Sequence, residues 1–342
     1  MITSNIFPIE WNLTDPLKVH YHGSSVFGTF VCGGGSTMGY KLAGFNHLGG
    51  VEFTEHYSSV YKHNHKPKYF YLEDIRLFNN RTDLPSELYN LDLLDGSPPC
   101  AAFSTAGARE KHWGKVKEYE GISQVKDDLV YVYCETIEKL KPKVFLLENV
   151  SGLAKGNAKI YLKNIVERLS KCYNVQVFML YAASMGIPQI RNRIFVIGHK
   201  KEFDLPKLEL NFSCPQLGFE VTKKYWHLGG HDISHLAIGR EWEKTKIGGS
   251  SDKFFNLCRP HPCKPCFTIT ESTSGNGVAS VVHPIQKRKL NIEEVRMLCT
   301  FPKDYDFLNV NGISVMGRSV LPVMMANIAN QIYLQWLIKI KQ

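Results

Sequence analysis

The sequence predicts an α/β fold in which short strands alternate with helices. Short apolar runs and amphipathic stretches alternate along the first 200 residues, as they do in repeated βα units. Several of these runs are apolar throughout, which is typical of central parallel strands buried on both faces of a sheet. With 342 residues, the chain is long enough for about two domains and a sizeable core.

The expected elements follow in chain order. Strands are expected at 24–32, 49–53, 91–96, 143–150, 175–183 and 193–200, and a further apolar run, YFYLEDI, ends at Ile75. Helices are expected at 127–141 and 158–172, where apolar residues recur at intervals of three and four. Such helices would cover the sheet on both faces.

Beyond residue 200 the pattern changes. Residues 201–258 have two glycine pairs, scattered aromatic residues and little periodicity, so we expect them to begin a second, loop-rich domain. Helical patterns return at 291–301 and 322–340, and Pro322 suits the first turn of the last helix.

Composition narrows the class of protein. The chain is 44% hydrophobic and 21% charged, which excludes disordered, collagen-like and coiled-coil classes. No stretch approaches about 18 apolar residues and no signal peptide pattern is present, so we expect no membrane span and a cytoplasmic location. The net charge of +9 suits a polyanionic partner. Nine cysteines, an odd number, favour reduced thiols over a disulfide framework.

A glycine cluster, FVCGGGSTMG (30–39), directly follows the first expected strand, where backbone can approach a ligand closely. Glu52 ends the next strand, 18 residues after Gly34, where a nucleotide-binding sheet places a carboxylate for ribose hydroxyls. Phe53 could stack on an adenine, and Asp74 could accept from its exocyclic amine. The pattern favours a nucleoside-containing cofactor, with a surface turn and solvated acids as the alternative.

A cysteine follows a proline pair in GSPPCAAFSTAG (96–107), after the apolar run LDLLD. Ligands bind outside the carboxyl ends of strands in such sheets, so Cys100 would be presented at the site. The prolines stiffen the turn and fix the direction of the thiol. The alternative, a buried cysteine that only packs, is uncommon inside such a turn.

Polar residues also mark two later strands. In FLLENVSG (145–152) an apolar strand ends in Glu148 and Asn149, and GIPQIRNRIFVIG (186–198) places Arg191 and Arg193 on one face of an extended segment after Gln189. Paired arginines suit phosphate or carbonyl recognition. A helix cap or salt bridge for the acid, and a solvated surface for the arginines, remain the alternatives.

The order of these motifs, with G-x-S-V near the end, resembles the cytosine-5 DNA methyltransferases of bacterial and phage restriction-modification systems, from about Phe30 to Ile332. The resemblance implies a Rossmann-like S-adenosylmethionine-dependent methyltransferase sheet with helices on both faces, plus a smaller loop-rich target-recognition domain. It implies a catalytic domain at 1–200, a target-recognition domain at 201–285, and a return to the catalytic domain at 286–342.

The resemblance also implies roles for single residues. Cys100 would add to carbon-6 of cytosine, Glu148 would assist at the ring nitrogen N3, and Arg191 and Arg193 would hold the base's carbonyl oxygen or nearby backbone. The implied cofactor residues are Phe30, Gly34, Gly35, Glu52, Phe53, Asp74, Ile75 and Ser319. No metal is implied, because packed thiols explain Cys263 and Cys266 better than a zinc site does.

A target cytosine must be flipped out of double-stranded DNA to reach a buried thiol. Residues 101–123 suit a loop that closes over it and contacts phosphates, with a plain surface loop as the alternative. The expected contacts are Ser104, Arg109, Lys111, His112 and Lys115. The resemblance further suggests a monomer, associated with the nucleoid, and a cognate restriction endonuclease as a possible partner.

Some positions depart from the family pattern. Cys32 stands where a glycine is usual, Ala101 where a glutamine is common, and Arg318 where an asparagine is usual. Two other functions remain open. One is a tRNA cytosine-5 methyltransferase of the same superfamily, because the tripeptide at 266–268 resembles one found in that branch. The other is a non-catalytic DNA-binding protein. A nicotinamide-dependent oxidoreductase would leave the PPC, ENV and QxRxR motifs unexplained.

Overall fold

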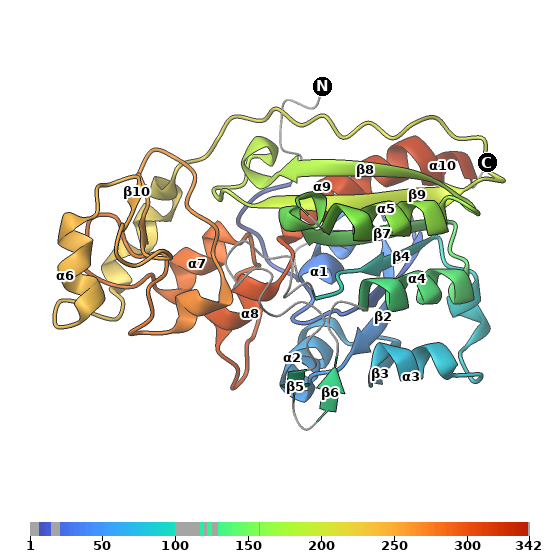
Figure 1. Ribbon diagram of the computed structural model, residues 1–342, viewed down its shortest axis with the longest axis horizontal. Coiled ribbons are helices and arrows are strands. Elements are labelled where there is room, and N and C mark those ends of the chain that lie inside the picture. Colours follow the sequence, from blue (N-terminus) through green and yellow to red (C-terminus); the bar gives the residue numbers. More distant parts are fainter. Residues whose placement is uncertain are drawn as a thin grey trace.

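A seven-stranded sheet in the order β3-β2-β1-β4-β7-β9-β8 forms the centre of the described part of the chain (Figure 1). The structure is a computed structural model and describes residues 7–14, 21–99, 117–119, 122–124, 129–156 and 158–340. The first five strands in this order are parallel, and β9 is antiparallel to both of its neighbours. The α/β fold expected from the sequence is confirmed.

The strands of this sheet are β1 (Ser25–Thr29), β2 (Asn46–Glu52), β3 (Tyr69–Leu72), β4 (Leu93–Gly96), β7 (Val144–Val150), β8 (Tyr173–Tyr181) and β9 (Asn192–Lys200). Two-stranded pairs are formed by β5 (Lys117–Tyr119) with β6 (Ile122–Gln124) and by β10 (Gly249–Ser250) with β11 (Cys258–Arg259). The α-helices are α1 (Gly35–Leu42), α2 (Glu55–His65), α3 (Ile75–Asn80), α4 (Leu129–Leu140), α5 (Ala158–Leu169), α6 (Ala237–Lys244), α7 (Ile292–Leu298), α8 (Gly312–Arg318), α9 (Pro322–Ile332) and α10 (Ile338–Ile340).

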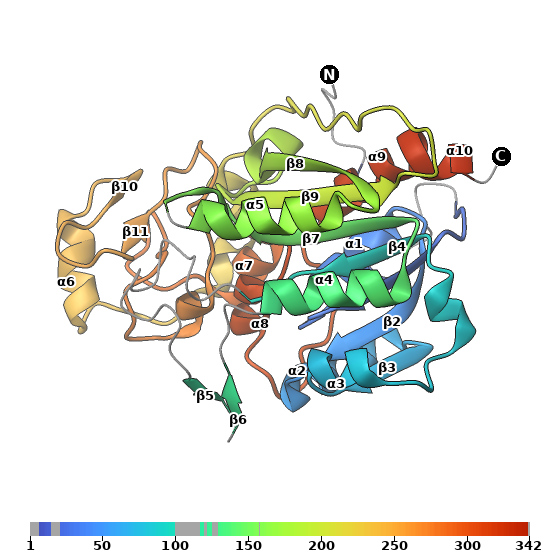
Figure 2. The ribbon, with the colours of Figure 1, turned by 45° about the vertical axis from the view of Figure 1, so that its right-hand side comes forward.

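Both faces of the sheet are covered by helices. Side chains alternate along each strand, so that Val26 packs into the core on one face and its neighbour Phe27 into the core on the other. The first core is completed by α1 and α9, and the second by α3, α4 and α5 (Figures 1 and 2). Burial on both faces explains the apolar run at the start of a central strand such as β7.

Helix α1 lies close against α9, which brings the last part of the chain back onto the sheet. A Cβ on Gly39 would lie 2.5 Å from the Cβ of Met325 and 2.6 Å from the carbonyl oxygen of Pro322, so only glycine allows this approach. The run Gly312–Ile340 is apolar and long enough to cross a membrane, but 83% of its most apolar window is buried inside the protein. Packing in the core accounts for its composition.

The region after β9 has little regular structure, as expected from the sequence. It contains a 3₁₀ helix at Phe219–Leu228, the helix α6 and the short β10–β11 pair, and a small apolar cluster of its own around Ile233 and Leu257. The chain returns to the sheet through α7, whose amino end has a capping box of Asn291 and Glu294.

Several element boundaries differ by a few residues from the sequence-based expectations, and two of these differences have a clear local cause. The first strand ends at Thr29 and not at Cys32, because Phe30 has φ 57° and turns the chain out of the sheet. The expected helix at 322–340 is interrupted by a π-helical stretch at Tyr333–Leu337, which the apolar periodicity does not reveal.

One carboxylate is buried inside the sheet. Asp95 in β4 is 2% exposed and accepts a hydrogen bond from the Tyr40 hydroxyl at 3.2 Å. Burial, with a smaller contribution from the charge of Glu148, raises the pKa of Asp95 to about 7. The native state therefore keeps this proton at pH values where the unfolded chain has lost it.

Replacing Asp95 with asparagine should flatten the pH dependence of stability. The contribution of Asp95 to the free energy of unfolding is fully present below its pKa in the unfolded chain, about 4, and is lost as the pH rises toward its pKa in the folded protein, about 7. Urea unfolding from about pH 5 to about pH 8 should show the wild type losing on the order of 3 kcal/mol relative to Asp95→Asn. Parallel curves for the two proteins would contradict this assignment.

Candidate functional site

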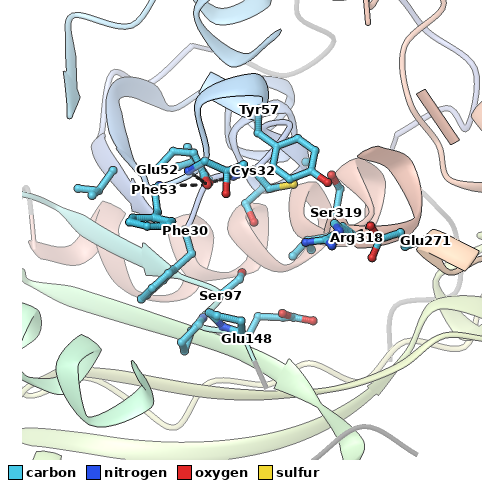
Figure 3. A pocket seen from close by; sticks show the side chains of 18 of the residues that line it. Phe30, Cys32, Glu52, Phe53, Tyr57, Ser97, Glu148, Glu271, Arg318 and Ser319 are labelled. Carbon is cyan, nitrogen blue, oxygen red and sulfur yellow. Dashed lines mark hydrogen bonds and ion pairs between the residues drawn. The ribbon is translucent and has the colours of Figure 1, made fainter. Parts of the chain in front are cut away.

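A cavity of about 780 Å³ opens at the carboxyl ends of the parallel strands. Its walls come from the turns after β1, β2, β3, β4 and β7 and from segments around Glu271 and Ser319 (Figure 3). The volume lies in the range of small-molecule and cofactor sites. Residues far apart in sequence therefore meet at the sheet edge where such folds bind ligands.

The glycine-rich turn after β1 forms the floor at one side of the cavity. Its backbone is left-handed at Cys32 (φ 46°) and at Gly34 (φ 76°). Cys32 thus has a left-handed backbone of the kind that favours glycine. Gly35 is required by close approach, because a Cβ there would lie 2.1 Å from the carbonyl oxygen of Val320.

Glu52 fixes this turn from the end of β2. One carboxylate oxygen accepts the Cys32 N–H at 2.7 Å, and the other accepts the N–H groups of Phe53 and Thr54 at 3.1 and 2.9 Å. Burial raises the pKa of Glu52, and these N–H donors oppose the rise. The carboxylate lines the cavity, as expected for a group that binds ribose hydroxyls.

Aromatic and acidic groups from three segments line another part of the cavity. Phe30 and Phe53 lie close together in Figure 3, and Ile75 is buried beside them in the lining. Asp74 caps α3 by accepting the Arg76 N–H at 2.8 Å and pairs with the Arg76 guanidinium at 3.2 Å. These groups suit a purine ring: two aromatic side chains for stacking and an acid at the rim.

Glu148 and Arg193 form an ion pair where β7 and β9 run side by side. Glu148 is 8% exposed, and its Oε1 lies 2.9 Å from the Arg193 Nε. The next residue, Asn149, donates from Nδ2 to the Pro98 carbonyl oxygen at 3.2 Å, which ties the end of β7 to the proline turn after β4. The acid is therefore held at the cavity beside the turn that leads to residue 100.

Arg191 lies behind the cavity and is 3% exposed. Its guanidinium donates to the carbonyl oxygens of Ile269 at 3.0 Å, Ser319 at 2.9 Å and Gly317 at 3.4 Å. Burial and the nearby charge of Arg193 lower its pKa to about 9, so it remains protonated at neutral pH. Arg191 was expected to hold either the carbonyl oxygen of the base or nearby backbone, and in the structure it binds backbone carbonyl oxygens.

Several expected site residues lie outside the described residues: Cys100, Ser104, Arg109, Lys111, His112 and Lys115. Those that the structure brings together around the cavity are Phe30, Gly35, Glu52, Phe53, Asp74, Ile75, Glu148, Arg191, Arg193 and Ser319. Gly34 belongs to the same turn, and a Cβ there would lie 2.1 Å from Nε2 of the buried His65.

Sequence reasoning missed many residues of the lining, and three of them carry polar groups that Figure 3 shows at the cavity. Tyr57 in α2, Ser97 after β4 and Glu271 all face the cavity in Figure 3. Ser97 carries a signal that only the structure reveals, because its buried hydroxyl has no hydrogen-bond partner among the described residues. Its position beside the proline pair in GSPPC was the available hint.

Comparisons with known proteins identify the family of this chain. The sequence profile of the C-5 cytosine-specific DNA methylase family matches residues 26–245. The type II methyltransferase M.FnuDI of Fusobacterium nucleatum is 27% identical over 333 residues, covering 86% of this chain and 90% of that protein.

Two solved structures show the same fold. An E. coli prophage protein described as a DNA modification methyltransferase superposes with a TM-score of 0.70 at 19% identity, covering 91% of this chain and 99% of that chain. DNMT2 of Spodoptera frugiperda gives 0.63 at 17% identity, covering 91% and 100%. Since the family profile spans well over half of its length, this chain belongs to the C-5 cytosine-specific DNA methylases, which transfer a methyl group from S-adenosylmethionine to cytosine in DNA.

Proposed function

We propose that this enzyme methylates carbon-5 of a cytosine flipped out of a specific double-stranded DNA site, with Cys100 as nucleophile and Glu148 as its partner. The observation that carries the proposal is the Asn149–Pro98 hydrogen bond of 3.2 Å. It joins the strand end that bears Glu148 to Pro98, which lies in the cavity lining two positions before Cys100 in the sequence. A thiol and an acid brought together there would act on the same ring.

The residues of the cavity fit S-adenosylmethionine. Phe30, Phe53, Asp74 and Ile75 would hold the adenine, and Glu52 the ribose, while Gly34, Gly35 and Ser319 border the remaining space. The buried hydroxyl of Ser97, which has no hydrogen-bond partner within the described part of the chain, offers the cofactor a further polar contact. Bound there, the cofactor supplies an electrophilic methyl group.

The protein residues would activate the base in a fixed order. Carbon-5 of cytosine is a weak nucleophile, so the Cys100 thiolate adds to carbon-6 and moves electron density to carbon-5. Glu148 hydrogen-bonds at N3 as negative charge develops on the ring, and Arg193 holds Glu148 in place through the 2.9 Å ion pair. After methylation a base removes the carbon-5 proton and Cys100 is expelled. Arg191 acts as a positioning residue for the backbone beside the cavity.

DNA recognition is assigned to two parts of the chain. Residues 201–285 would form the target-recognition domain, between catalytic portions at 1–200 and 286–342. The loop residues Ser104, Arg109, Lys111, His112 and Lys115 would close over the flipped cytosine and contact phosphates. Because M.FnuDI is a type II methyltransferase, we assign this enzyme to a restriction-modification system with a cognate endonuclease, acting as a monomer in the cytoplasm at the nucleoid.

Replacing Cys100 with serine should abolish methyl transfer. The hydroxyl is a far weaker nucleophile at neutral pH, so transfer of labelled methyl to unmethylated genomic DNA should fall by at least about 10³-fold. Wild type should label DNA at cytosine carbon-5 and leave tRNA unlabelled. Label on tRNA would favour the RNA enzyme, and DNA binding without any transfer would favour a non-catalytic protein.

Replacing Glu148 with glutamine should slow the chemical step while DNA binding persists. Loss of the acid at N3 should lower kcat by about 10²- to 10⁴-fold. Duplex DNA carrying 5-fluorocytosine provides a second readout, because the fluorine cannot leave as a proton does and the Cys100 adduct should persist. The wild type should form this adduct and Glu148→Gln should form it much more slowly. Equal rates of adduct formation would exclude a role in nucleophilic addition.

A further inference from the structure

An ion pair borders the cavity at the side of the glycine-rich turn. Arg318 Nη2 donates to Glu271 Oε1 at 2.7 Å, and both side chains line the cavity near Ser319 (Figure 3). Their side chains are 44% and 47% exposed, so the pair is open to solvent. Ion pairs as exposed as this one contribute little to folding stability. A role in ligand binding would explain why this pair lies at the cavity.

The backbone beneath the two side chains is fixed by buried contacts. Arg191 holds Ile269 and Gly317 together through their carbonyl oxygens. A Cβ on Gly317 would lie 2.4 Å from the carbonyl carbon of Thr270, so the two segments touch directly. Arg318 and Glu271 are thereby held opposite each other on rigid supports, and only their side chains are free to adjust.

The Arg318 guanidinium has more N–H donors than its partners in the described structure use. A guanidinium has five N–H donors, and within the described residues Glu271 takes a single hydrogen bond, from Nη2. The guanidinium also lies over the Tyr57 ring, with its Cζ 5.6 Å from the ring centroid. Glu271 and Tyr57 thus orient the group without exhausting its capacity to bind a second carboxylate.

Charge around the cavity is divided between its two ends. Glu52 and Asp74 place acids at the end assigned to the ribose and adenine. Among the arginines of the described lining, Arg191 is committed to backbone carbonyls and Arg193 to Glu148. Arg318 is therefore the arginine that can meet an anionic group of a ligand lying between the two ends.

We propose that Arg318 binds the α-carboxylate of S-adenosylmethionine and that Glu271 is the positioning residue that holds its guanidinium over the cavity. This inference rests on the cofactor site proposed above. Arginine matches a carboxylate with two parallel N–H donors, which an asparagine at this position cannot do. Because Glu271 lies on the segment that returns from residues 201–258, the same pair links that region to the cofactor.

The test compares two ligands that differ only in this carboxylate. Calorimetric binding without DNA should show that Arg318→Gln weakens S-adenosylmethionine by about tenfold or more. Binding of decarboxylated S-adenosylmethionine should change less than about twofold, because that ligand lacks the group in question. Arg168→Gln, which removes the comparable Glu138 ion pair on the helices α4 and α5, serves as the matched control and should alter neither.

Glu271→Gln separates positioning from direct contact. It should weaken S-adenosylmethionine by about threefold, leave the decarboxylated ligand unchanged, and add no further loss to Arg318→Gln. Equal losses for both ligands would overturn the proposal, as would unchanged binding of S-adenosylmethionine by Arg318→Gln. The wild type could fail to methylate DNA while Arg318→Gln weakens binding of S-adenosylmethionine but not of the decarboxylated ligand. That outcome would support this inference and refute the proposed function.

Discussion

The buried guanidinium of Arg191 is the contact on which the assembly of the site depends. The site needs a catalytic sheet from the first 200 residues and a wall from residues beyond 268, and Arg191 joins them through the carbonyl oxygens of Ile269, Gly317 and Ser319. A buried cation is costly unless it is hydrogen-bonded, and these carbonyls accept from both terminal nitrogens, while Nε has no partner among the described residues. Lysine would carry the charge but lacks the planar fork that reaches several carbonyls at once.

The same contact explains why the chain leaves the sheet and returns to it. Helix α9 packs against α1 through Gly39, and Val320 packs on Gly35 in the glycine-rich turn. The last segment therefore supports the turn that Glu52 holds from the other side. Residues 201–268 contribute nothing to the described lining of the cavity, whose two walls are joined at Arg191 and along the α1–α9 contact.

The sequence predicted the parts of the site that follow strands. Glu52 and Glu148 end apolar runs, and parallel strands bring their carboxyl ends to one edge, so their convergence on one cavity was foreseeable. The reversed direction of β9 was not, because apolar periodicity carries no information about strand direction. Tyr57 and Glu271 were missed for a related reason: each reaches the cavity only through packing between distant segments.

The tertiary structure also determines the partners of charged residues, which the sequence pattern does not reveal. Asp95 ends the apolar run LDLLD, and the structure buries its carboxyl group, which accepts a hydrogen bond from Tyr40 and whose pKa burial raises to about 7. Arg191 and Arg193 share one strand face in the sequence pattern, yet one binds backbone and the other binds Glu148. Which of two adjacent arginines meets an acid depends on the neighbouring strand, and that neighbour is set by the tertiary fold.

The cavity also contains a thiol that must not compete for the methyl group. Cys32 lines it, and a thiolate there would be a nucleophile close to a sulfonium cofactor. Burial, reinforced by the negative charge of Glu52, raises the pKa of Cys32 to about 12, so the group stays a thiol at neutral pH. The carboxylate that holds the Cys32 backbone N–H therefore also suppresses the reactivity of its side chain. A cysteine can occupy this position because the turn accommodates its left-handed backbone, and because burial together with the charge of Glu52 keeps its sulfur protonated.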